Sequence, residues 1–354
     1  MDFAFDDDQL AFRAQLRALA DKTCTPADIR AAWASAEGYS PARWEALAEM
    51  GVVGITVPEA HGGLGLGFVD LVLLLEEAGR AGLPEPLLET TALAVPLLVE
   101  AGGERAETLR QRWLPEVATG RAVVSVGVEE SGVVPAAMVA DLLLLVRDGE
   151  VHAVASAHTE RRLRLGLDGG RRPGQVAWSA RPETRLARGA EAEALVDRLR
   201  TRAATGAAAM LLGAAERLIT TTAAYAGERV QFGAPIGSFQ AVKHHLAGAL
   251  VRLEFSRPAV YRAAWSIDAG DPEATYHASM AKALASEAAL GAARVALQVH
   301  GAIGYTWEHD IHLWMKPAWA LAAAWGDAPT HRARVLAHLV AASEAGDRGG
   351  GGRE

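Results

Sequence analysis

The sequence predicts a mainly α-helical protein with a small β-rich domain in its middle, and three observations support that fold class. Apolar residues at helical spacing occupy most of residues 1–120, short β-branched and apolar runs follow over 121–188, and Ala-rich segments dominate 189–345. The Gly-rich end, 346–354, is typical of a flexible tail. We therefore expect an N-terminal helical domain, a middle β-domain and a C-terminal helical bundle.

The first 120 residues contain several helix signals. Residues 6–23 begin with acidic side chains, which suit the first turn of a helix, and then place apolar residues on one face. Ser40-Pro41 opens another helix, because a capping residue followed by proline is a common start, and Gly51 ends it. The Gly-rich stretch that follows predicts a loop. Further helices are expected over 68–82, 86–101 and 104–118.

After residue 120 the sequence changes from helical spacing of apolar residues to short apolar runs. Asp148-Gly149 separates the apolar runs Leu142–Val146 and Val151–Val154, which is a strong signal for a β-hairpin. Residues 160–186 carry Gly, Pro and Arg without regular alternation, which predicts short strands and loops. This middle region is therefore expected to be small and rich in strands.

Long Ala-rich segments return from about residue 190. Their lengths exceed the average helix and are typical of helical bundles. The helices are expected over 190–227, 238–256, 258–269, 272–299 and 310–345.

Composition excludes several classes of protein. Half of the 354 residues are hydrophobic, which indicates a globular chain. The net charge of −8 argues against a nucleic-acid partner. No apolar run is long enough to span a membrane, and the acidic N-terminus is unlike a signal or transit peptide. The single cysteine, Cys24, excludes an internal disulfide, fits a cytoplasmic location and is expected to be buried and inert.

The string from Arg229 to Gln240 combines side chains that suit a dinucleotide. Gly and Pro residues force a turn between two helices, and this turn brings Arg229, Gln231 and Phe232 close together. Such a set could hold a dinucleotide, with arginine on the pyrophosphate and phenylalanine on the adenine. On residue types alone, an ordinary helix–helix turn with a packed phenylalanine remains the alternative.

A second string, Gln298 to Lys316, begins where a long helix meets Gly301, Ala302 and Gly304. Glu308 follows between a tryptophan and a histidine. Taken alone, the glycines could be a plain helix C-cap, and Glu308 a surface carboxylate at the start of a helix. The nearby histidines match no recognised ligand spacing, so no metal site is expected.

Together the two strings resemble the acyl-CoA dehydrogenase family. R-x-Q-F-G-x-P-I-x-x-F-Q matches that family over a dozen positions, and Q-x-x-G-A-x-G matches its Q-x-x-G-G-x-G string except at Ala302. The resemblance implies a fold with an N-terminal helical domain, a middle β-domain and a C-terminal four-helix bundle. It also implies FAD as cofactor. The nucleotide half of FAD would be held by Arg229, Gln231, Phe232, Gln298, Gly301, Ala302 and Gly304.

The resemblance makes Glu308 the candidate catalytic base, because it lies four residues after the last glycine of the second string. The family removes the α proton and the β hydride of an acyl-CoA thioester. A base for that reaction needs a raised pKa and a site poor in water, and the enolate oxygen needs hydrogen bonds. The flavin accepts the hydride. Electron-transfer flavoprotein is the electron acceptor that the resemblance implies.

The middle domain departs from the family pattern. Glu129-Glu130-Ser131 loosely echoes one segment that contacts the flavin ring, but the tryptophan-containing segment after it is missing. Short chains of this kind resemble one subunit of the actinobacterial heteromeric (α2β2) acyl-CoA dehydrogenases, many of which act on steroid side-chain or other bulky CoA thioesters. The expected partner is thus a related acyl-CoA dehydrogenase subunit, with a homo-oligomer as the alternative.

Three other functions remain open from the sequence. The chain could be a non-catalytic subunit that completes the FAD site of its partner. It could be a flavin monooxygenase or oxidase on the same fold, although Glu308 counts against that class. It could be a structural helical scaffold, which the two dinucleotide strings count against.

Overall fold

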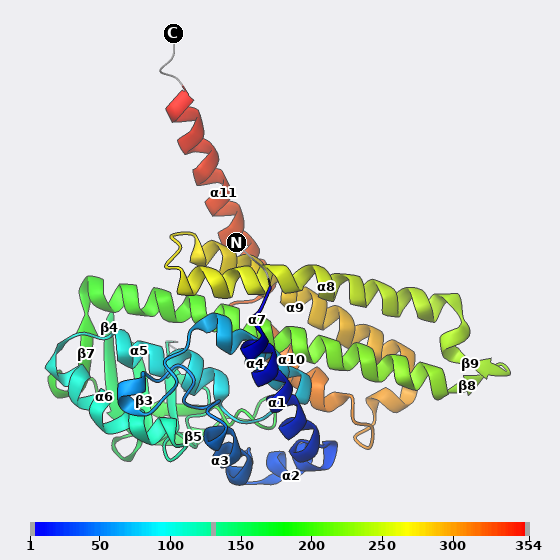
Figure 1. Cartoon of the computed structure of the whole chain (residues 1–354), viewed down its shortest axis with the longest axis horizontal. Helices are drawn as coiled ribbons and strands as arrows, with labels where there is room; N and C mark the ends of the chain where they lie inside the picture. Colours follow the sequence, from blue (N-terminus) through cyan, green and yellow to red (C-terminus); the bar gives the residue numbers. More distant parts are fainter. Residues whose placement is uncertain (1–3, 129–131, 351–354) are drawn as a thin grey trace.

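The computed structural model describes residues 4–128 and 132–350, with side chains to 344. The N-terminal domain is helical, as predicted (Figure 1). Its elements are α1 (Asp7–Thr23), α2 (Pro26–Ala34), α3 (Pro41–Glu49), α4 (Phe68–Ala81), a π-helical segment (Leu88–Ala94) continued by α5 (Val95–Glu100), and α6 (Gly103–Ala118).

Capping residues explain where these helices begin. Asp6 accepts a hydrogen bond from the Gln9 amide at the start of α1, and Ser40 accepts one from the Arg43 amide at the start of α3. Helix α2 was not among the expected elements, although Thr25 caps it through the Asp28 amide by the same chemistry. The residues expected as a loop after Gly51 contain only one short 3-10 turn, Glu59–His61.

The middle domain consists of two small sheets. The first has the order β1 (Val124–Gly127), β3 (Leu142–Arg147), β4 (Glu150–Ala155) and β7 (Arg185–Arg188); the second has the order β2 (Val133–Val134), β6 (Gly174–Ala177) and β5 (Glu160–Leu163). Strands β3 and β4 form the predicted hairpin, with Asp148 and Gly149 at positive φ in its turn. The segment Glu129-Glu130-Ser131 lies outside the described residues.

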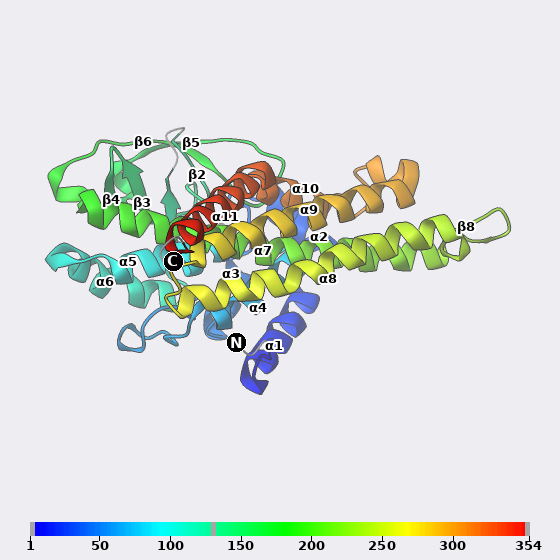
Figure 2. The ribbon, with the colours of Figure 1, turned by 90° about the horizontal axis from the view of Figure 1, so that it is seen from above.

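Three long helices form the C-terminal bundle (Figures 1 and 2). They are α7 (Gly189–Glu228), α8 (Gln240–Asp268) and α9 (Ala274–His300), and the shorter α10 (His312–Ala323) packs against α7 and α9. The expected break between 256 and 258 is absent, because α8 continues through Pro258. The mainly α-helical fold class is confirmed.

The segment expected as one helix over 310–345 is two helices. Trp325 and Gly326 both adopt positive φ, and the Asp327 carboxylate accepts a hydrogen bond from the Thr330 amide at the start of α11 (Ala328–Gly350). The buried ammonium of Lys282 donates to the carbonyls of Ala322 and Gly326 at this corner. Helix α11 packs on α9, stands away from the body (Figure 1) and continues to Gly350, five residues into the expected tail.

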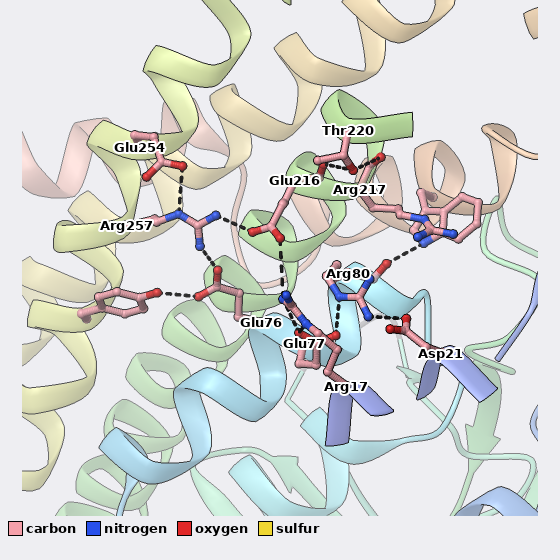
Figure 3. A network of polar contacts seen from close by, with 12 residues as sticks. Arg17, Asp21, Glu76, Glu77, Arg80, Glu216, Arg217, Thr220, Glu254 and Arg257 are labelled. Atoms are coloured by element: carbon pink, nitrogen blue, oxygen red, sulfur yellow. Dashed lines mark hydrogen bonds and ion pairs between the residues drawn. The ribbon is translucent and has the colours of Figure 1, made fainter. Parts of the chain in front are cut away.

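A network of ion pairs joins the N-terminal helices to the bundle (Figure 3). The Arg257 guanidinium of α8 pairs with Glu76 of α4, Glu216 of α7 and Glu254 of its own helix. Around the neighbouring Glu77, Arg17 and Arg80 bring α1 and α4 together. Since Glu76 and Glu77 are buried, these partners supply the charge compensation that burial requires.

Candidate functional site

The turn between α7 and α8 is a small β-hairpin rather than a simple helix–helix connection. Val230–Gln231 pairs with Ala234–Pro235, and Phe232 and Gly233 form the two-residue turn, both at positive φ. Two positive φ angles define the hairpin turn that suits the twist of its strands. A phenylalanine rarely adopts this conformation, so Phe232 is held there at an energetic cost.

This hairpin lies at the free end of the bundle (Figure 2), and residues 229–233 are exposed. Phe232 is 94% exposed, and its ring lies edge-on to that of Phe239, with ring centroids 6.1 Å apart. The exposed Arg229 guanidinium makes no hydrogen bond or ion pair with any described residue. The side-chain amide of Gln231 donates to the neighbouring Val230 carbonyl. An exposed aromatic ring beside an unpaired guanidinium can bind an aromatic ring and an anion.

The N-terminus of α8 adds positive potential to the same place. Phe239 occupies the N-cap position and no side chain caps the helix, because the Ser238 hydroxyl donates to the Pro235 carbonyl instead. The backbone connects this end to the arginine directly, since the Ile236 amide donates to the Arg229 carbonyl. Free amides at a helix N-terminus favour an anion such as a phosphate.

The second string forms a short 3-10 helix, Gly301–Tyr305, directly after α9. Gly301 has φ 64° and ψ −140°, a conformation that is essentially restricted to glycine. Gly304 is buried, and a Cβ there would lie 3.1 Å from both His300 Cβ and Ile311 Cδ1. Ala302 is not among the residues with positive φ, so replacing the family's second glycine causes no backbone strain. Gln298 and Ala302 are both exposed.

Glu308 lies in an exposed loop between two anchored neighbours. On one side Trp307 stacks on His312 at 4.4 Å, carries the Lys316 ammonium over its ring, and accepts from Arg30 through its carbonyl. Arg30 of α2 also pairs with Asp310 at 2.5 Å. On the other side His309 packs on His300. Glu308 itself is exposed and makes no hydrogen bond or ion pair with any described residue.

An aromatic cluster brings the two strings together. The Tyr225 ring, in the last turn of α7, stacks on the His300 ring at 4.2 Å. His309, next to Glu308, meets the His300 ring edge-on at 4.5 Å and the Tyr225 ring at 6.1 Å. His300 donates from Nδ1 to the Ala296 carbonyl, and burial lowers its pKa. The ring is therefore neutral, with a buried Nε2 acceptor that has no partner.

The interior of the chain holds a separate, small cavity between the N-terminal helices, the β-domain and the bundle. Its volume is about 40 Å³, and Trp33, Met210 and Trp314 are among its lining residues. Ligand pockets usually measure roughly 300–1,000 Å³, so this space suits a few water molecules. None of the site residues expected from the sequence lines it.

An ion pair lines this cavity beside the β-domain. Arg171, in the loop between β5 and β6, forms an ion pair with the buried Glu89. Asp168 of the same loop also lines the cavity, and burial raises the pKa of its carboxyl group, partly offset by the Arg171 charge. The loop thus fills the space between the β-domain and the helices with the chain's own side chains.

Two further expectations concern metal and thiol chemistry. Among the described residues, no group of three His, Cys, Asp or Glu side chains could hold a metal ion. Cys24 is buried as expected, and burial raises the pKa of its thiol to about 12, so it is inert as a nucleophile. No helix in the described ranges has the length and apolar character needed to cross a membrane.

Sequence reasoning placed the two strings but missed the residues that connect them. Tyr225 was not singled out, and His300 and His309 were considered only as metal ligands. A usable signal was present: Tyr225 lies one helical turn before Arg229, and His300 directly precedes Gly301. Arg30 gave no signal, because its contact with the Glu308 loop joins residues almost 280 positions apart.

Two family descriptions match the chain. "Acyl-CoA dehydrogenase, N-terminal domain" matches residues 6–121, and "Acyl-CoA dehydrogenase, C-terminal domain" matches residues 197–340. Among individual proteins, the chain is 34% identical to the acyl-CoA dehydrogenase IpdE2 of Mycobacterium tuberculosis over 317 residues, which covers 88% of this chain and 91% of that protein.

Solved structures agree with the sequence comparison. The ChsE4-ChsE5 complex from Mycobacterium tuberculosis contains a chain with a TM-score of 0.85 and 25% identity, over 96% of this chain and 99% of that one. The Tcur3481-Tcur3483 steroid acyl-CoA dehydrogenase, in a G363A variant, gives a TM-score of 0.84 and 27% identity over the same shares of the two chains. Both similarities extend over nearly the whole fold.

Proposed function

This chain belongs to the acyl-CoA dehydrogenase family of flavoproteins, and from that premise we propose that it is one subunit of a heteromeric, FAD-dependent enzyme that desaturates an acyl-CoA. One observation carries the proposal. Arg229 and Phe232, which suit the nucleotide half of FAD, are exposed at the free end of the bundle, and the Arg229 guanidinium pairs with no described residue, while the cavity lined by Trp33, Met210 and Trp314 has a volume of only about 40 Å³. The chain is thus equipped to complete a flavin site that another subunit holds.

The residues at the bundle end fit the adenosine diphosphate half of FAD. Arg229 and the uncapped start of α8 provide positive charge for the pyrophosphate. Phe232 offers an open ring for the adenine, and the exposed Gln298 lies near the end of α9, just before the Gly301–Tyr305 turn. When bound, FAD supplies the acceptor for the β hydride, which no side chain could provide. The chain's own residues bind and orient the nucleotide.

The proposed partner is a related acyl-CoA dehydrogenase subunit. Helix α8 carries an exposed apolar face with Leu250, Val251 and Phe255, and the Phe255 side chain is 79% exposed. An apolar face of this kind is typical of a surface that another protein covers. Two solved relatives are described as pairs of unlike chains, ChsE4-ChsE5 and Tcur3481-Tcur3483. The second is described as a steroid enzyme, which supports a bulky acyl group for this chain. Electron-transfer flavoprotein is the proposed electron acceptor.

Within this enzyme, Glu308 is the proposed base of this chain. Its two neighbours are held by Arg30, His312 and His300, so the backbone around the carboxylate is well positioned. A base that removes the α proton of a thioester needs a site without water. Because Glu308 is exposed in the single chain, the partner subunit would have to cover it.

The exposure of Glu308 also supports a second candidate function, that of a non-catalytic subunit. Glu308 lies outside the interior cavity and makes no polar contact with any described residue. If the partner supplies the base, this chain completes the FAD site and takes no part in proton transfer. Both candidates share the nucleotide contacts and differ only in the role of Glu308.

The experiment compares the chain alone, the partner alone and the two expressed together. Desaturation of a straight-chain acyl-CoA and of a steroid side-chain CoA thioester is followed with an artificial electron acceptor. We expect turnover only from the assembled complex. Turnover by the lone chain would contradict the heteromeric function.

Glu308→Gln in the complex then separates the two candidates. The amide keeps the size of the side chain but cannot accept a proton, so loss of a general base should lower turnover at least about a hundredfold while FAD is retained. Turnover close to that of the unaltered complex would place the base on the partner. Glu193→Gln, at an exposed site on α7, is the control for loss of a surface carboxylate.

A further inference from the structure

We propose that Tyr225, His300 and His309 form a positioning cluster that sets the Arg229 hairpin and the Gly301–Tyr305 turn at the separation FAD requires. The inference rests on the proposed function, because it concerns how tightly the same nucleotide site holds FAD. These residues act through the two strings rather than by touching the cofactor.

The cluster has a direct connection to each string. The Arg229 amide donates to the Tyr225 carbonyl at 2.8 Å, so one backbone hydrogen bond links the arginine to the tyrosine. His300 is the last residue of α9 and is followed at once by Gly301. The stacked rings of Tyr225 and His300 therefore link the segment just before Arg229 to the residue just before Gly301. His309 extends the same contact to the loop that carries Glu308.

Within the described residues, direct polar contacts do not fix the distance between the two strings. Across the described residues, no hydrogen bond or ion pair joins the hairpin at 229–237 to the turn and loop at 301–309. The separation of the two strings therefore depends on how α7 and α9 pack, and the Tyr225–His300 ring stack is a contact between the last turns of these two helices. A ligand that bridges the strings binds more tightly when their separation is already fixed.

The chemistry of His300 suits a rigid contact. Its Nδ1 donates to the Ala296 carbonyl at 2.7 Å, which fixes the ring plane and leaves Nε2 as a buried acceptor without a partner. A protonated ring would place a charge among buried groups, and neither side chain that faces it, Tyr225 or His309, is a carboxylate that could compensate that charge. The neutral ring is therefore the form that stacks on Tyr225.

The magnitude of the effect follows from the strength of aromatic pairs. Such pairs contribute about 0.5–1.5 kcal/mol beyond burial, which corresponds to a roughly two- to tenfold change in affinity if the whole contribution reaches the bound state. We expect Tyr225→Ala and His300→Leu to weaken FAD binding by about three- to tenfold. Tyr225→Phe keeps the ring and should remain within about twofold of the unaltered chain.

The chain offers a matched control in a second tyrosine–histidine stack. Tyr276 of α9 stacks on His338 of α11 at 4.3 Å with nearly the same interplanar angle. Tyr276→Ala removes an equivalent contact from a place where neither string lies. A merely structural role for tyrosine stacks would make Tyr225→Ala and Tyr276→Ala alike in both stability and FAD affinity.

The test uses the complex with its partner subunit, stripped of flavin and titrated with FAD while flavin fluorescence is recorded. Unfolding midpoints of the same variants are measured in parallel. We expect Tyr225→Ala and His300→Leu to lose FAD affinity, Tyr225→Phe to restore it, and Tyr276→Ala to change the unfolding midpoint alone. Unchanged FAD affinity in Tyr225→Ala and His300→Leu, or an equal loss in Tyr276→Ala, would overturn the proposal.

Arg229→Ala in the same titration distinguishes failure of the positioning cluster from failure of the proposed nucleotide site. If Arg229→Ala weakens FAD binding and the ring variants do not, the positioning cluster is wrong and the nucleotide site stands. If Arg229→Ala also leaves FAD binding unchanged, the proposed nucleotide site fails and the cluster fails with it.

Discussion

Two arginines of the C-terminal bundle occupy opposite environments. Arg257, in the middle of α8, is largely buried and pairs with carboxylates from α4, α7 and α8 (Figure 3). Arg229, at the end of α7, is exposed and pairs with none of the described residues. The two side chains are chemically identical, and only their partners differ.

The difference indicates which charges maintain the fold and which are available to a ligand. Tyr261 adds a hydrogen bond to Glu76, so this carboxylate is satisfied from two directions. At the bundle end, by contrast, Phe232 is exposed in a strained conformation and α8 starts without a side-chain cap. Unpaired charge, an exposed aromatic ring and backbone strain in one place are typical of binding sites. The contrast can be tested by altering both regions.

The largest effect is expected from Arg257→Ala. Removing this guanidinium leaves Glu76 and Glu216 without their main partner, and breaking such a buried network costs about 3–5 kcal/mol of stability. Denaturant unfolding of the lone chain measures this loss. Arg200→Ala is the matched control, because Arg200 and Asp197 form an exposed pair worth less than about 1 kcal/mol. Equal effects of the two variants would refute the assignment of Arg257 to the fold.

Arg229→Ala should show the reverse pattern. Loss of a charge-assisted phosphate contact costs roughly 1.5–3 kcal/mol, which is about a tenfold to hundredfold loss of FAD affinity in the complex. The unfolding free energy of the lone chain should change by less than about 0.5 kcal/mol, because Arg229 has no partner to lose. Normal flavin retention by the variant complex would show that Arg229 is only part of a turn.

A smaller effect concerns pH and the corner between α10 and α11. Burial lowers the pKa of His331 to about 4, and its Nε2 donates to the Trp325 carbonyl. As the pH falls, the unfolded chain binds this proton near pH 6.5, before the folded chain does. The stability that the neutral ring contributes above pH 6.5 is therefore lost progressively toward pH 4.

His331→Gln tests this titration, because the amide keeps a donor and does not titrate. Between pH 7 and pH 5 the unaltered chain should lose about 1–2 kcal/mol more stability than the variant. Parallel pH profiles for the two proteins would contradict a neutral, buried His331. Flavin affinity, which depends on the other end of the bundle, should respond equally to pH in both complexes.

The last prediction concerns Cys24, which lies in neither of the two compared regions. With a thiol pKa of about 12 the folded chain holds far less thiolate at pH 8 than the unfolded chain, so alkylation by iodoacetamide should be roughly a thousandfold slower. Mass spectrometry of alkylated samples with and without denaturant gives the ratio. Rapid labelling of the native chain would show that the N-terminal helices open more readily than the structure indicates.

Local signals allowed much of the fold to be predicted. The Asp148-Gly149 hairpin and the Ala-rich α7 follow from turn chemistry and helix propensity, which depend on neighbouring residues. The break at Trp325-Gly326 was missed because helical periodicity continues on both sides of it. Its signal was present, since Gly326 is followed by a capping Asp327 and then by Pro329.

The site was less predictable because it depends on contacts between distant residues. The strings around Arg229 and Gly301 could be located from their order of residues, but the β-hairpin that exposes Phe232 could not. Arg171 and Glu89, which both line the small interior cavity and form an ion pair, are 82 positions apart. No local pattern encodes such a contact, so only the folded chain shows that the interior is filled.

The most direct test of the account is the ratio of flavin to protein in the chain purified alone and in the complex with its partner. A small interior cavity and an exposed nucleotide site predict little FAD in the lone chain and about one FAD for each pair of unlike chains. Absorbance of the flavin and the native mass of each sample give both quantities. One FAD per lone chain would contradict the account, because it would show that this chain holds the whole cofactor by itself.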